Sequence, residues 1–192
     1  MLDFKNKVIG GFDLLFLFGR GIEKFSGTKK EAIISFYVSL AFFPAGLAFA
    51  YFYHPKGMEA GYGYLQIATT VITQFVLSFI LSNALVATIA WSLKKLDKFW
   101  LFFSASNWVS VPFFIVTLPF MIVAATGIVA RDEMDRIFVL LACYSYVVTA
   151  CIAWKSFNLN WQLAGTIAIA TLFVNQEIGH LTYIVQGIPI PW

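Results

Sequence analysis

The sequence has few charged residues and only two cysteines, and both shortages narrow the class of protein. Charged residues make up 12% of the 192 positions, whereas hydrophobic residues make up 60%. Soluble domains carry about 25% charged and about 45–50% apolar residues, so the composition excludes an ordinary soluble domain. Cys143 and Cys151 lie on one predicted helix, about 12 Å apart along its axis, which is too far for a disulfide. We expect both to be small packing residues.

The sequence also lacks the residue sets that catalytic and metal sites require. It contains only two histidines, and the predicted membrane spans offer no Ser-His-Asp set, no paired carboxylates and no facing pair of histidines. Glu177 and His180 form one Glu-x-x-His unit, but a di-iron bundle needs a second unit and two further carboxylates. We therefore expect no catalytic residue, no cofactor and no metal, and a protein that is not an enzyme.

Long apolar runs, in contrast, fill most of the chain. A helix needs about 20 apolar residues to cross the hydrocarbon core of a bilayer. Five runs meet this length: 32–53, 64–91, 100–129, 136–154 and 161–185. We therefore predict an all-α, polytopic membrane helix bundle with five transmembrane helices. The transmembrane domain covers residues 28–192 and follows a separate segment, residues 1–27.

Apolar residues in segment 1–27 recur at steps of three or four, the period of an α-helix: Phe4, Val8, Phe12, Leu15, Phe18, Ile22 and Phe25. Charged residues lie between them, which is typical of an amphipathic interfacial helix on the cytoplasmic leaflet. Gly10-Gly11 and the pair Gly19 and Gly21 are expected to break this helix into pieces. The alternative to a simple anchor is a specific role in protein docking or lipid sensing.

The sequence Gly27-Thr28-Lys29-Lys30-Glu31 indicates where the next helix begins. Threonine is a favoured N-cap residue, and an acid three positions later completes a capping box. We predict that Thr28 caps the helix. The glycine spacing does not match a phosphate-binding loop.

Basic residues set the orientation. One side of the membrane receives ten of them: Lys5, Lys7, Arg20, Lys24, Lys29, Lys30, Lys94, Lys95, Lys98 and Lys155. The opposite side receives three, Lys56, Arg131 and Arg136. Positively charged loops stay in the cytoplasm, so we predict a cytoplasmic amino terminus and, with five spans, a carboxyl terminus outside. A bacterial inner membrane is the expected location.

Two spans carry neutral polar stripes. Thr70, Gln74, Ser78 and Ser82 repeat every four residues in the second span, with Asn83 beside the last. Ser104, Asn107 and Ser110 repeat every three residues in the third span. Polar side chains in hydrocarbon face other helices, so we expect the two stripes to face one another and hold the bundle together. A polar path for a substrate or ion is the alternative.

The fifth span contains the only deeply placed acid. Glu177 lies beside Asn175 and Gln176, and shares a helix face with His180. Ionisable groups at this depth are costly and are functional hypotheses by default. These four residues are the candidate functional cluster, either as a proton relay or ligand contact, or as a hydrogen-bonded group near the outer interface.

Several local motifs add a resemblance, and they are spread over the spans: Lys29-Lys30-Glu31-Ala32, Ser104-Ala105-Ser106-Asn107-Trp108-Val109-Ser110-Val111-Pro112, Trp154-Lys155-Ser156-Phe157 and Ala164-Gly165-Thr166-Ile167-Ala168-Ile169-Ala170. Together with five spans and a preceding amphipathic segment, they resemble the Yip1 family of small membrane proteins over roughly residues 28–175. For eukaryotic members, the resemblance implies roles in vesicle membranes and contacts with lipidated small GTPases. For bacterial members, it implies an inner-membrane protein of undefined activity, and it supplies no catalytic residues.

The sequence therefore favours a non-enzymatic, Yip1-like structural or accessory membrane protein. Its expected partners are the lipid bilayer, a membrane protein or a second copy of the chain, and a bound lipid, with no nucleic acid. The alternative is a small transporter or channel subunit that uses the polar stripes of the second and third spans and Glu177.

Overall fold

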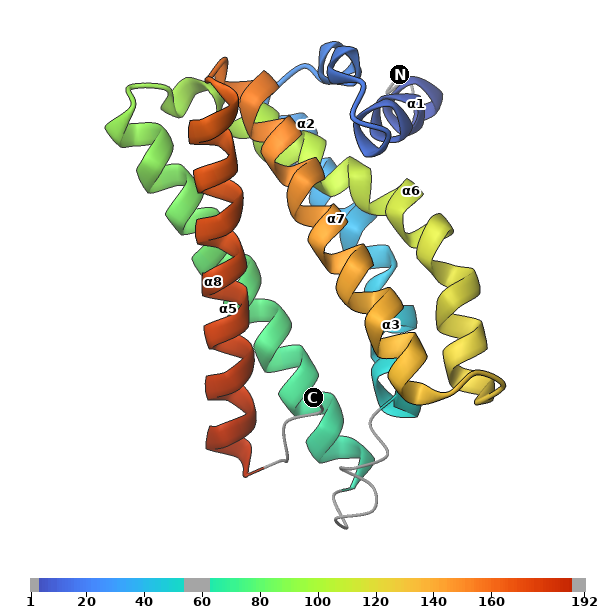
Figure 1. The fold of residues 1–192 in the computed structure, drawn as a ribbon. Helices are drawn as coiled ribbons and strands as arrows, with labels where there is room; N and C mark the ends of the chain where they lie inside the picture. The colour runs from blue at the N-terminus through green and yellow to red at the C-terminus, as the bar shows by residue number, and fades with distance from the viewer. Residues whose placement is uncertain (1–3, 54–62, 188–192) are drawn as a thin grey trace.

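A computed structural model describes residues 4–53 and 63–187, and these residues form helices joined by short turns, without a β-strand. The elements in chain order are α1 (Phe4–Leu15), η1 (Gly19–Lys24), α2 (Lys29–Ala41), α3 (Phe43–Tyr53), α5 (Tyr64–Ser92), η2 (Leu96–Lys98), α6 (Phe99–Thr126), α7 (Arg131–Phe157) and α8 (Trp161–Gln186) (Figure 1). The predicted all-α class is confirmed for this part of the chain. The extreme carboxyl terminus, predicted to lie outside, falls beyond the described residues.

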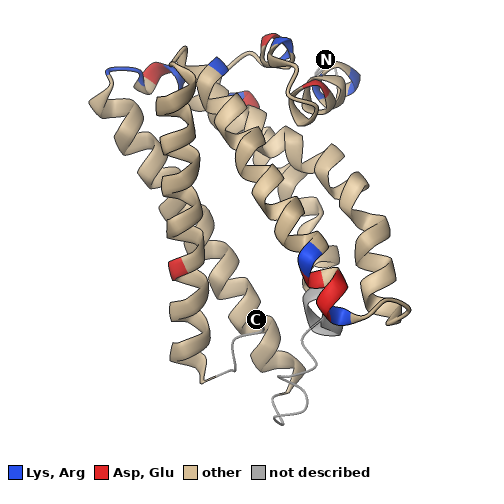
Figure 2. Cartoon of the chain, in the orientation of Figure 1, with Lys and Arg blue, Asp and Glu red and all other residues tan. Residues whose placement is uncertain are grey.

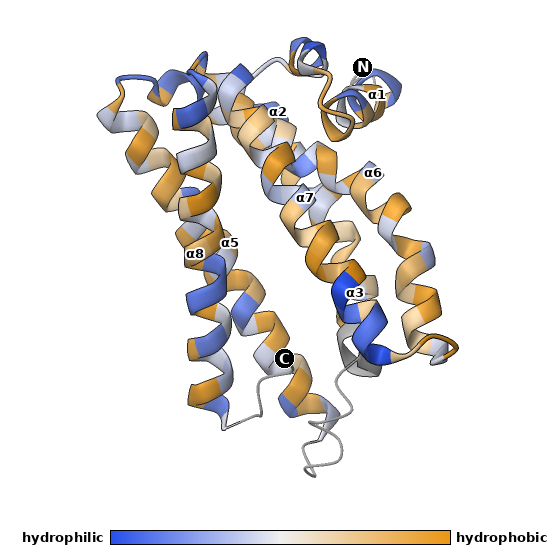
Figure 3. Ribbon diagram, viewed as in Figure 1, coloured by the Kyte–Doolittle hydropathy of each residue, from blue (hydrophilic) through white to orange (hydrophobic). Residues whose placement is uncertain are grey.

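Four helical segments are long and apolar enough to cross a membrane: Lys29–Ala48, Tyr64–Ser92, Leu96–Thr126 and Arg131–Phe157. They indicate a multi-pass integral membrane protein. The predicted fifth span is also helical, as the 26 residues of α8, but α8 does not reach the same apolarity among the described helices. The reason is its second half, where Figure 3 shows hydrophilic turns and where the sequence runs Asn175-Gln176-Glu177.

Two predicted span boundaries need correction. The first span is not one helix, because α2 ends at Ala41 and α3 begins at Phe43. Pro44 has no N–H and cannot donate a helical hydrogen bond. Just before it, the Phe42 N–H donates to the Ser39 carbonyl, three residues back, at 3.2 Å. The helix of the fourth span begins before the predicted residue 136, since α7 starts at Arg131 and carries Asp132 and Glu133 in its first turn. Acids are favoured there by the helix dipole.

The helices are joined so that their ends alternate between two ends of the bundle (Figure 1). The α5–α6 and α7–α8 turns meet at one end, where the Lys95 Nζ donates to the carbonyls of Phe157 at 2.5 Å and Asn158 at 2.9 Å. Charged residues gather at the two ends (Figure 2). The buried core lies toward the end that holds these turns, and it includes Val86, Trp108 and Phe157.

The segment 1–27 packs against the bundle. α1 is continuous through Gly10 and Gly11, so the predicted break there is wrong, and the chain turns instead at Leu17, whose φ is 62°. A Cβ atom at Gly11 would lie 2.8 Å from the carbonyl oxygen of Trp108 in α6. Glycine thus allows α1 and α6 to touch through their backbones, and Leu14 is fully buried beside this contact.

Several aromatic side chains of this segment stay exposed, with Phe4 60%, Phe16 57% and Phe18 54% exposed. Phe4 also contacts α6, because its ring lies edge-on to Trp108 with the centroids 5.2 Å apart. Exposed aromatic side chains next to basic residues are typical of a helix at the membrane interface.

Thr28 caps α2 as predicted, but Glu31 does not complete the capping box with Thr28 and binds Ser26 instead. The Thr28 Oγ1 accepts from the Glu31 N–H at 3.2 Å, and the Glu31 carboxylate accepts from the Ser26 N–H at 2.7 Å. Glu31 also has a partner that the sequence does not indicate, Lys7, which is distant along the chain. Its Nζ lies 2.6 Å from a Glu31 oxygen and ties α1 to α2.

Candidate functional site

The polar stripe of α5 faces α8, not the stripe of α6 as predicted. The Ser82 Oγ donates to the Asn175 Oδ1 of α8 at 2.8 Å. The Gln74 amide lies against Gly179, where a Cβ would be 3.0 Å from the Gln74 Nε2. The Thr70 hydroxyl donates within its own helix, to the Gln66 carbonyl at 2.8 Å. Neutral polar groups of α5 therefore help to join α5 to α8.

The remaining members of the α5 stripe are Ser78 and Asn83. Ser78 is half-buried. The Asn83 Nδ2 donates to the Phe79 carbonyl at 2.7 Å, one turn earlier in the same helix. Ser78 is thus only partly covered, and the hydrogen bond of Asn83 stays within α5 and does not reach the α6 stripe.

The stripe of α6 turns toward α2. The Asn107 Nδ2 donates to the Ser35 Oγ of α2 at 3.1 Å, and both side chains are buried. The Ser110 hydroxyl donates to the Asn107 carbonyl at 2.6 Å. Ser104 is fully buried, and its Oγ has no hydrogen-bond partner among the described residues. The helix that packs on the polar stripe of α6 is therefore α2, and not α5 as predicted.

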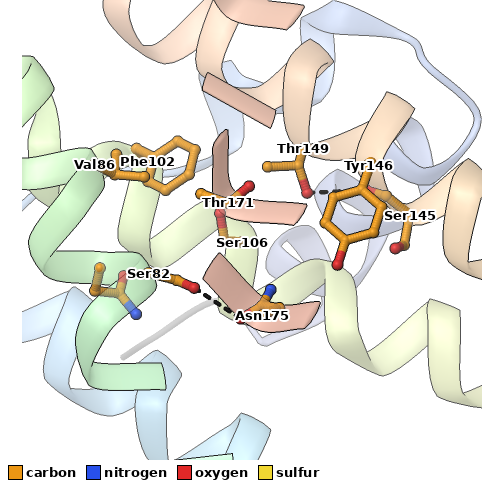
Figure 4. A pocket seen from close by; sticks show the side chains of 10 residues that line it. Ser82, Val86, Phe102, Ser106, Ser145, Tyr146, Thr149, Thr171 and Asn175 are labelled. Atoms are coloured by element: carbon orange, nitrogen blue, oxygen red, sulfur yellow. Dashed lines mark hydrogen bonds between the residues drawn. The ribbon is translucent and has the colours of Figure 1, made fainter. Parts of the chain in front are cut away.

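A polar cavity of about 240 Å³ lies among α5, α6, α7 and α8. Its lining is mostly hydroxyl and amide side chains, which come from all four helices: Ser82, Asn83, Val86, Phe102, Ser106, Ser145, Tyr146, Thr149, Thr171 and Asn175 (Figure 4). No charged side chain belongs to this lining. The cavity is therefore a neutral hydrogen-bonding site inside an apolar bundle.

An apolar cavity of about 390 Å³ lies between α2, α3, α5 and α6. Its walls include two aromatic contacts, with ring centroids of Phe42 and Phe114 4.8 Å apart and those of Phe43 and Phe75 4.5 Å apart. Gly46 opens one wall, since a Cβ there would meet nothing within 4 Å. The Gln74 and Ser110 side chains also reach this cavity.

A third cavity of about 180 Å³ links the other two. It shares Ser106, Ser145 and Thr149 with the polar cavity. It shares Ser110 and Phe113 with the apolar cavity. The three cavities thus adjoin one another through shared lining residues, and together they are called the cleft below, with a polar end and an apolar end.

Ser106 is one of several residues of this site that the sequence pattern missed, as are Ser145, Tyr146, Thr149 and Thr171. It stands outside the three-residue repeat of Ser104, Asn107 and Ser110. Its Oγ is buried without a hydrogen-bond partner among the described residues, and it lines both the polar and the linking cavity. Only its place in the motif Ser104–Pro112, where small polar residues are frequent, gave a signal.

The predicted cluster on α8 does not form a single site. Asn175 lines the polar cavity and bonds to Ser82. Gln176 and Glu177 are exposed, and His180 is half-buried. Glu177 belongs to none of the three cavities of the cleft.

In residues 4–53 and 63–187, no three His, Cys, Asp or Glu side chains are close enough to hold a metal ion. Cys143 is exposed, Cys151 is buried, and neither forms a disulfide.

Comparison with protein-family models, curated proteins and solved structures gives no match for this chain. The cleft is therefore the feature from which function is argued.

Proposed function

We propose that this chain is a non-enzymatic, multi-pass membrane protein that binds a lipid in its cleft. The observation that carries this proposal is the apolar cavity of about 390 Å³ lined by Phe42, Phe43, Phe75, Phe113 and Phe114. Ligand cavities are mostly apolar with a few polar groups that orient the ligand, and this cleft has that composition. Its walls belong to helices apolar enough to cross a membrane.

The lining of the cavity favours an acyl chain as its occupant, because phenylalanine side chains make up most of its apolar wall. A flexible acyl chain can follow an irregular apolar cavity of this kind.

We also propose that the chain is a Yip1-like accessory protein of a bacterial inner membrane, with a cytoplasmic amino terminus. In this proposal α8 is a fifth crossing. Two contacts support it: Ser82 bonds to Asn175 near the middle of α8, and the Gln66 Nε2 donates to the Gln186 carbonyl at 3.4 Å near its end. These contacts join the second half of α8 to residues 66–82 of α5.

The substitution Gly46→Leu tests lipid binding. The leucine side chain enters the apolar cavity without meeting protein atoms at its Cβ, so it should displace lipid while leaving the helices in place. A loss of about 1.4 kcal/mol of binding free energy weakens binding tenfold, and we expect the lipid-bound fraction in native mass spectra, after extraction in mild detergent, to fall accordingly.

Gly165→Leu is the matched control. Gly165 is also in a helix, and a Cβ there also meets nothing within 4 Å, but it lines none of the three cavities. Its bound fraction should equal that of the unmodified chain. Equal lipid occupancy in the two leucine variants would remove the support for this function.

A transporter of an uncharged solute is the second candidate, and the polar cavity favours it. Hydroxyl and amide groups there could replace the water around a polar solute. Uptake into proteoliposomes separates the two candidates: a transporter carries an uncharged polar solute across the membrane, whereas a protein that only binds lipid does not.

A further inference from the structure

The polar end of the cleft contains an unsatisfied group. The Ser106 Oγ is buried and has no hydrogen-bond partner among the described residues. A buried hydroxyl without a partner costs free energy. A ligand group that bonds to this hydroxyl would recover that cost.

The neighbouring hydroxyls define what the ligand must offer. Those of Ser145, Thr149 and Thr171 each donate to a carbonyl of their own helix, at 2.7, 2.9 and 2.8 Å. Their oxygens can still accept a hydrogen bond, so the cavity favours a ligand that donates. No Asp, Glu, Lys, Arg or His lines the cavity, and a charged head would therefore be buried without a counter-ion.

One face of α6 sets the direction of the ligand. Ser106, Ser110, Phe113 and Thr117 follow each other at steps of three or four residues and line the cleft from its polar to its apolar end. Such steps keep side chains on one helix face. From Ser106 to Thr117 the face is about 16 Å long at 1.5 Å per residue. A polar head at Ser106 would thus direct an attached chain toward the phenylalanines.

We infer that the cleft selects a lipid with an uncharged, hydroxyl-bearing head, such as the glycerol of a monoacylglycerol. The head lies in the polar cavity at Ser106, and the acyl chain lies in the apolar cavity. This inference rests on the proposed lipid binding and adds the class of lipid.

Binding of four probes to the full-length chain in detergent tests the inference, with native mass spectrometry as the measurement. The probes are 1-oleoylglycerol, methyl oleate, 1-oleoyl-lysophosphatidylglycerol and free glycerol. The first should bind most tightly. Methyl oleate lacks the hydroxyls, the lysophospholipid adds a charge, and glycerol lacks the chain, so each should bind more weakly. Glycerol binding as tight as that of 1-oleoylglycerol would overturn the lipid assignment and favour the transporter.

Ser106→Ala should weaken binding of 1-oleoylglycerol by about two- to twelvefold, the range that one hydrogen bond of about 0.5–1.5 kcal/mol gives. Its binding of methyl oleate should stay unchanged, which also reports an intact fold. Ser104→Ala is the control, because Ser104 has the same unpartnered hydroxyl on the same helix but lies outside the cleft. Equal affinities of the two alanine variants, or preference for the anionic probe, would refute the head-group selectivity. If Gly46→Leu still loses lipid in that case, the proposed function itself stands.

Discussion

Glu31 is a buried acid whose charge is matched by a lysine from another helix. Its side chain is 4% exposed and that of Lys7 is 12% exposed. The pair therefore has little contact with water, and each charge depends on the other. Ser26 supplies a further hydrogen bond to the same carboxylate.

Replacing Glu31 with glutamine should destabilise the protein. The amide keeps the shape of the side chain but leaves the Lys7 ammonium without its counter-ion, and breaking a buried pair on one side costs about 3 kcal/mol. We expect a lower midpoint of thermal unfolding in detergent. Glu23→Gln changes an exposed acid of η1 and should shift the midpoint of thermal unfolding little. Equal midpoints for both variants would show that the pair does not hold α1.

Contacts between residues close in sequence were predictable from the sequence, whereas contacts between distant residues were not. Thr28 and Glu31 lie within one helical turn, so their capping contact follows from spacing alone. Lys7 reaches Glu31 only because α1 folds back onto the bundle. Ser106 likewise became a candidate only when four helices enclosed it.

At the scale of the elements, the contact of α1 with α6 depends on glycine. A Cβ at Gly11 would lie 2.8 Å from the Trp108 carbonyl oxygen, and one at Gly21 would lie 2.6 Å from the Gly10 carbonyl oxygen. Both neighbours are backbone atoms, which cannot rotate away. The glycines that look like helix breakers in the sequence are thus points of close approach.

Gly11→Ala should therefore separate α1 from α6. Overpacking of this kind costs about 1–3 kcal/mol, so we expect a lower unfolding midpoint and faster tryptic cleavage at Arg20 and Lys24 in the folded protein. Gly165→Ala adds the same methyl group in open space. It should raise the free energy of unfolding by up to about 1 kcal/mol, and the midpoint slightly, because alanine favours helix. Cleavage of the Gly11 variant at the unmodified rate would contradict the docking.

The helix positions themselves were largely predictable, with two instructive exceptions. The α2–α3 break depends on Pro44, a signal that is present in the sequence but is masked by the long apolar run around it. The early start of α7 was missed because its first turn is charged, as Arg131, Asp132 and Glu133 show. Hydropathy detects the membrane-embedded part of a helix and not its extension beyond the membrane.

For the whole molecule, the ends of the bundle define a topology that labelling can test. We predict that Asp97→Cys, in a chain without Cys143 and Cys151, reacts with a membrane-impermeant maleimide only after spheroplasts are lysed. Ile128→Cys should react in intact spheroplasts, because Ile128 is 81% exposed at the opposite end. The reverse pattern would invert the orientation derived from the basic residues.

Gln186→Cys extends the same measurement to α8. It should react like Ile128→Cys, because Gln186 lies beside Gln66 in the first turn of α5. Protection of Gln186→Cys in intact spheroplasts, with Ile128→Cys reactive, would contradict a fifth crossing.

The sequence by itself determined the membrane class, the positions of the helices and the concentration of charge at their ends. These properties depend on the length and polarity of continuous segments, which can be counted along the chain. The tertiary structure alone decided that the α5 stripe meets α8, that the α6 stripe meets α2 and that Ser106 lines a cleft. A membrane helix is apolar on nearly every side, so its pattern does not identify its neighbour. Only packing selects that neighbour, and the cleft exists where α5 and α6 are held apart.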